Sequence, residues 1–297
     1  MAKQPPRPTS GATQPLIDPA AALAVLVSAA PRTYAFFLGS AVSSPTIPTG
    51  QEVRRDTLAL IYKAQTKQTP DAGADLDSWW RSRAGAQATY SSMLESVFPT
   101  TEERRRYLAG FFEGKQPNPT HKEFARMAKR GLIDVFVTTN FDRLLEKALE
   151  EEGLSVVAVS FGEQVKAAPP REHAEVYVLK LHGDYGSGRI RNTDRELEKL
   201  DPEMETEFGL VLERYGLVVL GYAGEDAAVV RLLRGRGTRY GLYWVVRGSP
   251  SKAQSELVSS IGGQFIHADQ IEPFLEDVQH RIAALATQPD GRLPGQH

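Results

Sequence analysis

The sequence contains no cysteine among its 297 residues. Disulfide bonds, thiolate nucleophiles and zinc modules built on cysteine are therefore excluded, and the absence fits a reducing compartment. The chain also lacks a surplus of either charge, because 35 basic residues stand against 37 acidic ones and the formal net charge is -2. Such a balance does not attract nucleic acid or an anionic membrane. Local basic clusters such as Arg104 to Arg106 fit a solvated helix face, so we expect no direct nucleic-acid binding.

Long apolar runs are missing as well. The longest, "AAALAVLVSAA", holds about eleven residues, whereas a membrane-spanning helix needs about 20. The stretch before it has too few basic residues and too many prolines for a signal peptide. We expect a cytoplasmic protein that does not contact a membrane. Residues 1–16 should be a disordered arm, Asp18 and Pro19 should start the first helix, and residues 287–297 should be a flexible tail.

Short apolar runs alternate with helical patterns along most of the chain. "NFDRLLEKALEEEG", "EDAAVVRLLRG" and "IEPFLEDVQHRIAALA" carry apolar residues at helical spacing. The apolar runs are rich in β-branched or aromatic residues and end in small or polar ones, which is typical of buried strands. Their alternation with helices predicts an α/β fold, with a parallel sheet and helices on both faces. The runs cover residues 33–39, 133–140, 155–160, 176–183, 217–222, 242–248 and 264–268.

The segment from about residue 50 to 131 breaks this alternation. It contains several helix signals and no convincing strand pattern. Thr120, which begins the stretch "THKE", has the spacing of a capping box at the start of a helix. We expect the segment to be a helical insertion or subdomain packed beside the first strand, with Trp79 and Trp80 in its core.

Polar residues follow four of the predicted strands at the point where each strand ends. Ligands of parallel α/β sheets bind beyond the carboxyl ends of the strands, so these residues should meet in one crevice. The first stretch offers backbone N–H groups and serine hydroxyls, which suits a phosphate, although a glycine-poor turn with serines is common. The four stretches are Gly39 to Ser43, Thr138 to Asp142, Lys180 to Asp184, and Gly221 to Asp226.

His182 has both a structural and a catalytic interpretation. A single histidine is more often structural, but the neighbouring Gly183 would let a ligand approach the backbone closely. Histidine also titrates near neutral pH and can take or relay a proton. The other histidines lack such a setting and are interpreted as surface or core residues: His121, His173, His267, His280 and His297.

Asn140 and Asp142 also have two interpretations each. Asn140 is a good N-cap for a helix that begins at Phe141, and Asp142 would then lie in the first helical turn, where a carboxylate is favoured. The amide of Asn140 has more than one hydrogen-bonding group, so capping and ligand binding can coexist.

The four stretches, taken in order, resemble the SIR2-like family. These are sirtuin-related NAD-binding proteins, many of which act in bacterial antiviral defence. The family pattern is roughly GAGxS and GIPT, then TTNFD, then KLHGD, then a GYS-like motif with a downstream aspartate. The matching stretches are "LGSAVSSPTIPTG", "VTTNFDRLLE", "LKLHGDYG" and "VVLGYAGED", and the resemblance runs from about Thr33 to Arg247.

The resemblance implies a Rossmann-like NAD-binding core with an inserted helical region, a single SIR2-like domain over residues 17–286. Proteins of this family cleave the nicotinamide–ribose bond of NAD, and their catalytic pair maps onto Asn140 and His182. Asp142 would lie near the nicotinamide. Gly39 to Ser43 would face the pyrophosphate, and the motif from Gly221 to Asp226 the adenosine side. The implied NAD contacts are Gly39, Ser40, Ala41, Ser43, Pro48, Thr139, Asp142, Gly221, Tyr222 and Asp226.

The chain also departs from the family pattern. Sirtuin deacetylases carry a four-cysteine zinc module, so the absence of cysteine argues against a deacetylase of that build, and we expect no metal. Ala41 and Thr46 stand where the family has glycines, and their Cβ atoms are expected to narrow the approach to the pyrophosphate. Tyr222 and Ala223 replace a GYS-like pair, which removes a hydroxyl.

The leading hypothesis is an NAD hydrolase that consumes NAD as its substrate and acts as the effector of a bacterial antiphage or anti-plasmid defence system. Such an enzyme should stay silent until a partner or homo-oligomerisation triggers it. The resemblance implies an Argonaute-type or other nucleic-acid-sensing protein as the partner. Two alternatives stay open: a non-catalytic module that binds NAD or ADP-ribose, and a mono-ADP-ribosyltransferase.

Overall fold

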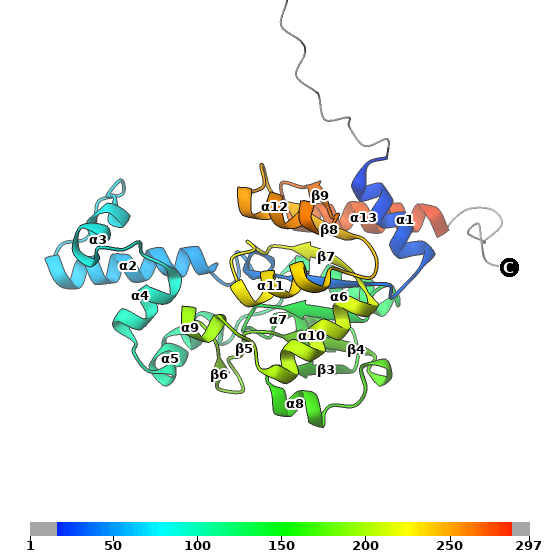
Figure 1. The fold of residues 1–297 in the computed structure, drawn as a ribbon, viewed down its shortest axis with the longest axis horizontal. Helices are drawn as coiled ribbons and strands as arrows, with labels where there is room; N and C mark the ends of the chain where they lie inside the picture. The colour runs from blue at the N-terminus through cyan, green and yellow to red at the C-terminus, as the bar shows by residue number, and fades with distance from the viewer. Residues whose placement is uncertain (1–16, 287–297) are drawn as a thin grey trace, which may run out of the picture.

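A computed structural model of the chain describes residues 17–286. The segments expected to be a disordered N-terminus, residues 1–16, and a flexible C-terminal tail, residues 287–297, lie outside the described residues. Seven parallel strands form the main sheet in the order β3-β4-β2-β1-β7-β8-β9 (Figure 1). This confirms the predicted α/β fold. The strands are β1 (Tyr34–Leu38), β2 (Val135–Thr138), β3 (Val156–Val159), β4 (Val176–Lys180), β7 (Gly216–Leu220), β8 (Leu242–Val246) and β9 (Gln264–His267).

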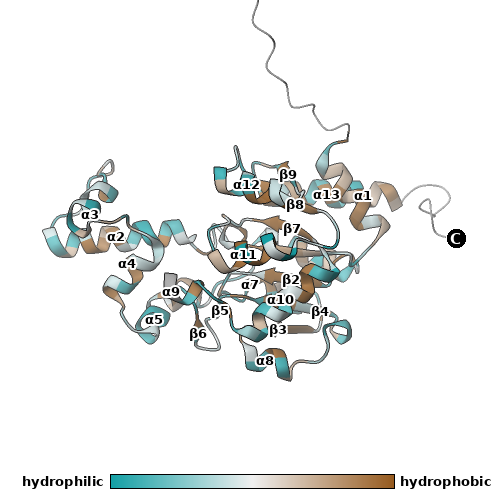
Figure 2. Ribbon diagram, viewed as in Figure 1, coloured by the Kyte–Doolittle hydropathy of each residue, from teal (hydrophilic) through white to brown (hydrophobic). Residues whose placement is uncertain are grey.

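The central strands are apolar without alternation because both faces of the sheet are covered. Every residue of β1, β2, β4, β7 and β8 is buried, whereas β3 and β9 at the two edges are partly exposed. Figure 2 shows the hydrophobic colour concentrated in these strands. The chain runs from β1 to β2 on one side and later returns to β7 on the other. The carboxyl end of β1 is therefore a topological switch point, where α/β sheets bind ligands.

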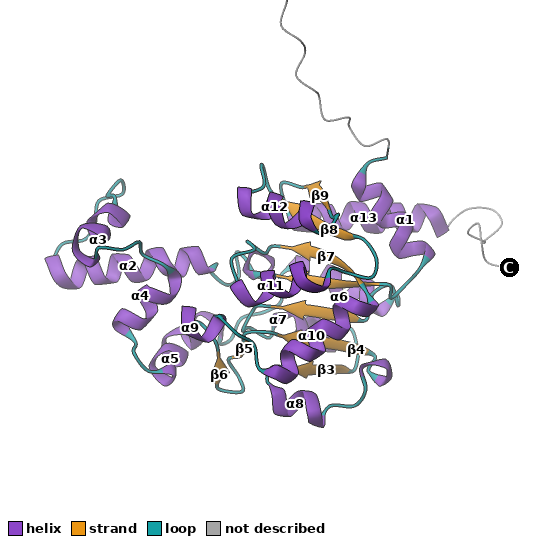
Figure 3. Cartoon of the chain, viewed as in Figure 1, coloured by secondary structure: helices purple, strands orange, loops and turns teal. Residues whose placement is uncertain are grey.

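Helices form a layer on each face of the sheet (Figure 3). Helix α1 starts as predicted: Asp18 is its N-cap, and Oδ1 of Asp18 accepts a hydrogen bond from the Ala20 amide at 3.2 Å. One layer consists of α1 (Pro19–Ala29), α6 (Pro119–Lys129), α7 (Leu144–Glu151) and α13 (Ile271–Ala286). The other consists of α8 (Gly162–Ala167), α10 (Pro202–Arg214), α11 (Ala227–Arg236) and α12 (Lys252–Ser260).

Four helices project from the sheet as a separate unit, which we call the helical arm (Figure 1). They are α2 (Gly50–Thr66), α3 (Leu76–Ala84), α4 (Tyr90–Val97) and α5 (Thr101–Phe112). Trp79 and Trp80 pack against a small apolar cluster of this arm. Helix α6 lies in the segment counted with the insertion, but it packs on the sheet through Phe124, so the projecting part ends at Phe112.

Short elements complete the fold. The turn after β1 is a 3₁₀ helix, Ser40–Val42, and a second 3₁₀ helix covers Arg171–His173. Strands β5 (Gly183–Asp184) and β6 (Arg189–Ile190) pair antiparallel in a hairpin, and α9 (Asp194–Leu197) follows it. Among residues 17–286, no helix combines the length and the apolar character that crossing a bilayer requires.

Candidate active site

A cavity of about 550 Å³ lies beyond the carboxyl ends of β1, β2, β4 and β7, and the helical arm forms its outer wall. The arm contributes Tyr90, Ser91, Leu108 and Phe112 to the lining. Ten of the twelve site residues named from the sequence line this cavity, and Gly39 and Ala41 do not. The ten are Ser40, Ser43, Pro48, Thr139, Asn140, Asp142, His182, Gly221, Tyr222 and Asp226.

His182 is buried in the cavity wall and paired with Asp226. Nε2 of His182 lies 3.1 Å from Oδ1 of Asp226, and only 8% of the histidine side chain is exposed. Burial raises the pKa of Asp226, but the hydrogen bond and charge of His182 and the hydroxyl of Tyr222 bring it below its ordinary value. Burial and the Asp226 charge raise the pKa of Tyr222 well above its ordinary value, so Tyr222 keeps its proton. The expected place of Asp226 was on the adenosine side, whereas the structure brings its carboxylate to the imidazole.

Asn140 is held by its amide nitrogen. Nδ2 donates to the carbonyl of Gly39 and to Oγ of Ser43, both at 3.2 Å. A carbonyl oxygen can only accept, so the contact with Gly39 determines which end of the amide faces the first loop. Oδ1 of Asn140 is buried and has no hydrogen-bond partner among the described residues. The expected N-cap role is wrong, because α7 begins only at Leu144 and its N-cap is Arg143.

Ser43 and Asp142 are joined in the floor of the cavity. Oγ of Ser43 donates to Oδ2 of Asp142 at 2.8 Å, and the imidazole of His121 lies 3.3 Å from the same Oγ. Oδ1 of Asp142 accepts from the Leu144 amide at 3.0 Å. Asp142 therefore lies in the turn before α7 and not in the first turn of the helix. His121 was interpreted from the sequence as an ordinary surface or core residue, yet it touches this site through Ser43.

Part of the chain matches a known protein family. The family model of the SIR2-like domain matches residues 134–273, which include Asn140, His182 and Asp226. Residues 134–273 therefore form a SIR2-like domain. No curated protein matches the chain.

Solved structures resemble this chain along most of its length. One, described as the structural basis for the mechanism and regulation of Sir2 enzymes, has 13% identity and a TM-score of 0.50 over 90% of this chain and 98% of that one. Another, a crystal structure of a Sir2 homologue in complex with NAD, has 16% identity and a TM-score of 0.51 over 89% of this chain and 94% of that one. At these identities the likeness shows the fold alone.

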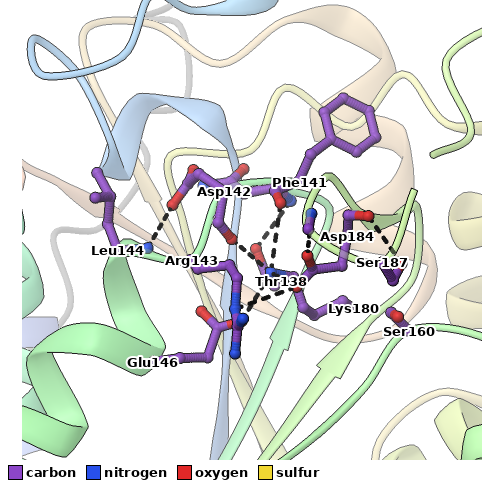
Figure 4. Close-up of polar contacts among 12 residues, drawn as sticks. Thr138, Phe141, Asp142, Arg143, Leu144, Glu146, Ser160, Lys180, Asp184 and Ser187 are labelled. Atoms are coloured by element: carbon purple, nitrogen blue, oxygen red, sulfur yellow. Dashed lines mark hydrogen bonds and ion pairs between the residues drawn. The ribbon is translucent and has the colours of Figure 1, made fainter. Parts of the chain in front are cut away.

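A buried lysine ties two motifs of the protein together (Figure 4). Nζ of Lys180 lies 2.7 Å from Oε1 of Glu146 and 2.8 Å from Oδ2 of Asp184, and it donates to the carbonyl of Asp142 at 2.5 Å. None of the Lys180 side chain is exposed. Burial lowers the pKa of Lys180, but the two carboxylates together raise it above its ordinary value. The ammonium therefore stays charged and joins the loop after β2 to the loop after β4.

Two glycines of the motifs serve backbone packing. A Cβ on Gly183 would lie 2.1 Å from the carbonyl of Arg189, and φ of Gly183 is +94°. The space beside Gly183 is thus filled by the β5–β6 hairpin, and the expectation that it admits a ligand is wrong. A Cβ on Gly39 would lie 2.4 Å from the carbonyl of Gly221, so Gly39 allows the loops after β1 and β7 to touch.

The two residues that replace family glycines stand outside the cavity wall. Ala41 belongs to the exposed 3₁₀ turn, where its amide donates to the carbonyl of Gly221 at 3.2 Å. Neither Ala41 nor Thr46 lines the cavity. The expectation that their Cβ atoms narrow the approach to a bound ligand therefore has no support in this arrangement.

Asn192 is a lining residue that was not named from the sequence. It is fully buried, and its Oδ1 accepts from Nε of Arg104 at 2.8 Å. A guanidinium only donates, so the amide nitrogen of Asn192 must point the other way, and Nδ2 has no partner among the described residues. Arg104 also donates to Oε1 of Glu196 at 2.9 Å, which joins the arm to α9.

Acidic and histidine side chains are present in the site, but they do not form a metal centre in the described part of the chain. Among the side chains that the structure describes, no group of three or more histidine, cysteine, aspartate or glutamate residues could hold a metal ion. The polar residues that line the cavity include the His182–Asp226 pair, Asn140 and Asn192.

Proposed function

We propose that this protein binds NAD in the cavity and hydrolyses its nicotinamide–ribose bond, releasing nicotinamide and ADP-ribose. One observation carries the proposal: a buried His182–Asp226 pair and Asn140, whose amide nitrogen is fixed by Gly39 and Ser43, line the same cavity at the switch point of the sheet. The SIR2-like domain over residues 134–273 supports it, as does the fold shared with a Sir2 homologue that was solved in complex with NAD.

His182 would act as the proton acceptor of the reaction. Its Nε2 faces Asp226, so Nε2 carries the proton of the neutral ring and Nδ1 is left as the basic nitrogen. No described residue is a partner of Nδ1. The negative charge of Asp226 stabilises the imidazolium that forms when Nδ1 takes a proton from the attacking water. General base catalysis of this kind contributes typically about 10²–10⁴-fold.

The bond changes balance without a further reactant. As the ribose C1–nitrogen bond breaks, its electron pair returns to the nicotinamide ring and neutralises the cationic leaving group. Positive charge develops at C1, as in glycoside cleavage, and the oxygen of water forms the new bond there. The proton of that water passes to His182 and then to solvent.

Asn140 would orient the water or a ribose hydroxyl. Both N–H groups of its amide are occupied by Gly39 and Ser43, so only Oδ1 remains to accept a hydrogen bond from the substrate. An oriented acceptor costs no rearrangement at the moment of reaction, which is the advantage of a preorganised site.

We extend the proposal to a cytoplasmic effector of bacterial defence against phages or plasmids. The support is the resemblance of the four motifs to SIR2-like proteins that act in such systems. An enzyme that depletes NAD must be inactive until triggered. We propose homo-oligomerisation or a nucleic-acid-sensing partner of Argonaute type as the trigger.

The test is to incubate the purified chain, alone and with the products of neighbouring genes, with NAD and to follow free nicotinamide. We expect His182→Ala and Asn140→Ala each to lower the rate by about 10²-fold or more. His280→Ala, a change of an exposed histidine on α13, is the matched control and should leave the rate unchanged. NAD loss that survives both site substitutions would contradict the mechanism.

The same experiment separates the two other functions. Binding of NAD without nicotinamide release under every trigger favours a non-catalytic regulatory module. Release of nicotinamide together with ADP-ribose attached to a protein favours a mono-ADP-ribosyltransferase, because only the acceptor differs between that reaction and hydrolysis.

A further inference from the structure

His121 makes two defined contacts although it lies outside the cavity lining. It is 1% exposed and lies at the start of α6. Its Nδ1 accepts a hydrogen bond from the backbone amide of Asn118 at 3.3 Å, and its Nε2 lies 3.3 Å from Oγ of Ser43. An amide N–H can only donate, so the proton of the neutral ring must be on Nε2. Nε2–H therefore donates to Ser43.

The start of α6 is hydrogen-bonded to the residues on both sides of Ser43. Nδ2 of Asn118 donates to the carbonyl of Val42 at 2.9 Å and to the carbonyl of Ser44 at 3.3 Å. Oδ1 of Asn118 accepts from the His121 amide at 3.1 Å, which closes the capping box and holds the ring in place. The loop that carries Ser43 is thus attached to a helix of the sheet layer.

The hydroxyl of Ser43 is saturated by this arrangement. Oγ accepts from Nε2–H of His121 and from Nδ2–H of Asn140, and its single proton is donated to Asp142. A hydroxyl has one donor and two acceptor positions, so all three are used. The N–H of His121 occupies one lone pair of Ser43 Oγ. The hydroxyl proton of Ser43 then points to Asp142, and the second lone pair accepts from the Asn140 amide.

The imidazole of His121 stays neutral at physiological pH. Burial lowers its pKa to about 4, although the charge of Asp142 acts in the opposite direction. A protonated ring would lose the acceptor that Nδ1 offers to Asn118. His121 is therefore suited to a constant hydrogen bond and not to proton transfer.

We propose that His121 is a positioning residue for NAD cleavage, which orients Ser43 so that the amide of Asn140 presents its Oδ1 to the substrate. The inference rests on the proposed function of the cavity, because it concerns the same asparagine. It assigns no contact between His121 and the substrate: the ring acts only through Ser43.

Two substitutions separate positioning from packing. His121→Gln keeps a neutral donor and an acceptor on a side chain of similar reach, whereas His121→Phe keeps the volume and removes both. We expect His121→Phe to lower kcat of NAD cleavage about 10-fold with little change in KM, and His121→Gln to recover most of the rate. Met127→Leu, a volume-conserving change at a buried position of the same helix, is the packing control.

A double-mutant cycle tests whether His121 acts through Ser43. Ser43→Ala removes the group that His121 orients, so adding His121→Phe to Ser43→Ala should lower kcat no further. Effects of the two changes that multiply would overturn the inference, as would a kcat of His121→Gln equal to that of His121→Phe.

NMR spectra test the role of His121 without a measurement of NAD cleavage. In ¹⁵N NMR spectra of the full chain, His121 should show the tautomer protonated on Nε2 between about pH 5 and 8. The side-chain NH₂ signals of Asn140 should shift in His121→Phe and stay in place in His121→Gln. If the chain cleaves no NAD, the proposed function fails while these signals still decide the inference. A ring protonated on Nδ1, or Asn140 signals unmoved by His121→Phe, overturns it.

Discussion

Asp226 carries the charge that sets the chemistry of His182. Its carboxylate lies 3.1 Å from Nε2 and is largely shielded from water, so the attraction between the two groups is stronger than at the surface. The carboxylate also determines which ring nitrogen holds the proton. The hydroxyl of Tyr222 accepts from the Asp226 amide at 3.3 Å and holds the start of α11 beside the pair.

We expect Asp226→Asn to lower kcat of NAD cleavage about 10²-fold, because a neutral amide no longer stabilises the imidazolium. KM should change little if Asp226 does not contact NAD itself. Steady-state release of nicotinamide measures both parameters, with Asp269→Asn, an exposed aspartate, as the control. A large rise in KM with an unchanged kcat would instead support the contact on the adenosine side.

The same substitution should show in the pH dependence of stability. The pKa of Asp226 is lower in the folded chain than the unfolded value of about 3.9, so its charge stabilises the fold above that pH. The contribution is lost as the pH falls through the folded pKa. Urea unfolding should therefore find a larger difference in free energy of unfolding between wild type and Asp226→Asn at about pH 6 than at about pH 3. A difference that grows toward acid contradicts the pairing.

Adding a Cβ atom at Gly39 should disturb the fold, whereas removing the Cβ atom of Ala41 should change little. Gly39→Ala places a methyl group 2.4 Å from the carbonyl of Gly221, and we expect it to destabilise the fold by about 1–3 kcal/mol. Ala41→Gly lies outside the cavity lining and should leave the Kd for NAD within about twofold. Thermal unfolding and calorimetric titration measure the two effects. A clear gain in NAD affinity in Ala41→Gly would instead support the expectation that the Cβ atom of Ala41 narrows the approach of the pyrophosphate to the first loop.

Among the elements, the loops after β2 and β4 are held together by the ammonium of Lys180. Its partners come from α7, from the turn before α7 and from β5, and all of them are buried. A charge in such a place is stable only while its partners remain. The cluster therefore couples the position of Asp142 to that of the His182 loop.

We expect Lys180→Met to destabilise the protein by about 3–5 kcal/mol, because Glu146 is left buried without its partner. Adding Glu146→Leu should recover part of the loss, since an apolar pair of similar volume removes the unpaired charge. Lys166→Met, which breaks the exposed pair with Glu203, is the control and should change the unfolding midpoint little. Chemical unfolding of the variants measures these differences, and a Lys180→Met protein as stable as wild type would contradict the role of the cluster.

At the scale of the whole molecule, Arg104 joins the arm to the wall of the cavity. The residue was expected on a solvated face, yet it is 3% exposed. Its guanidinium donates to Asn192, to Glu196 and to the carbonyls of Phe98 and Pro99. Movement of the arm would therefore alter the side of the cavity that Asn192 lines.

We expect Arg104→Met to loosen the arm while the sheet stays intact. Hydrogen exchange should become faster in α4 and α5 and remain slow in β1 and β7, because the lost contacts lie within the arm and between the arm and the residues after the hairpin. The affinity for NAD should fall as Asn192 loses its orientation. Arg106→Met, an exposed arginine of the same helix, is the matched control. Equal exchange in the two variants would mean that Arg104 does not anchor the arm.

The start of α6 shows why some local expectations failed. Thr120 was expected to begin the helix with Glu123 as its capping partner, whereas Asn118 is the N-cap and pairs with His121. Both residue pairs have the required spacing of three, but Asn118 is followed by Pro119, the same order of N-cap and proline that predicted the first helix. Asn118 is further held in the N-cap position because its side chain also donates to the carbonyls of Val42 and Ser44, which lie 76 and 74 residues away along the chain.

The sequence by itself determined the α/β fold, the position of every strand of the main sheet, and the four loops that meet at its carboxyl edge. Those features follow from the local spacing of apolar residues and from the rule that parallel strands end at one edge. Only the tertiary structure decided that Asp226 holds His182, that His121 holds Ser43 and that Arg104 holds Asn192. The two hydrogen bonds among these contacts join residues 78 and 88 positions apart. The physical reason is that a polar side chain binds whichever group packing brings within reach, and packing depends on the whole chain.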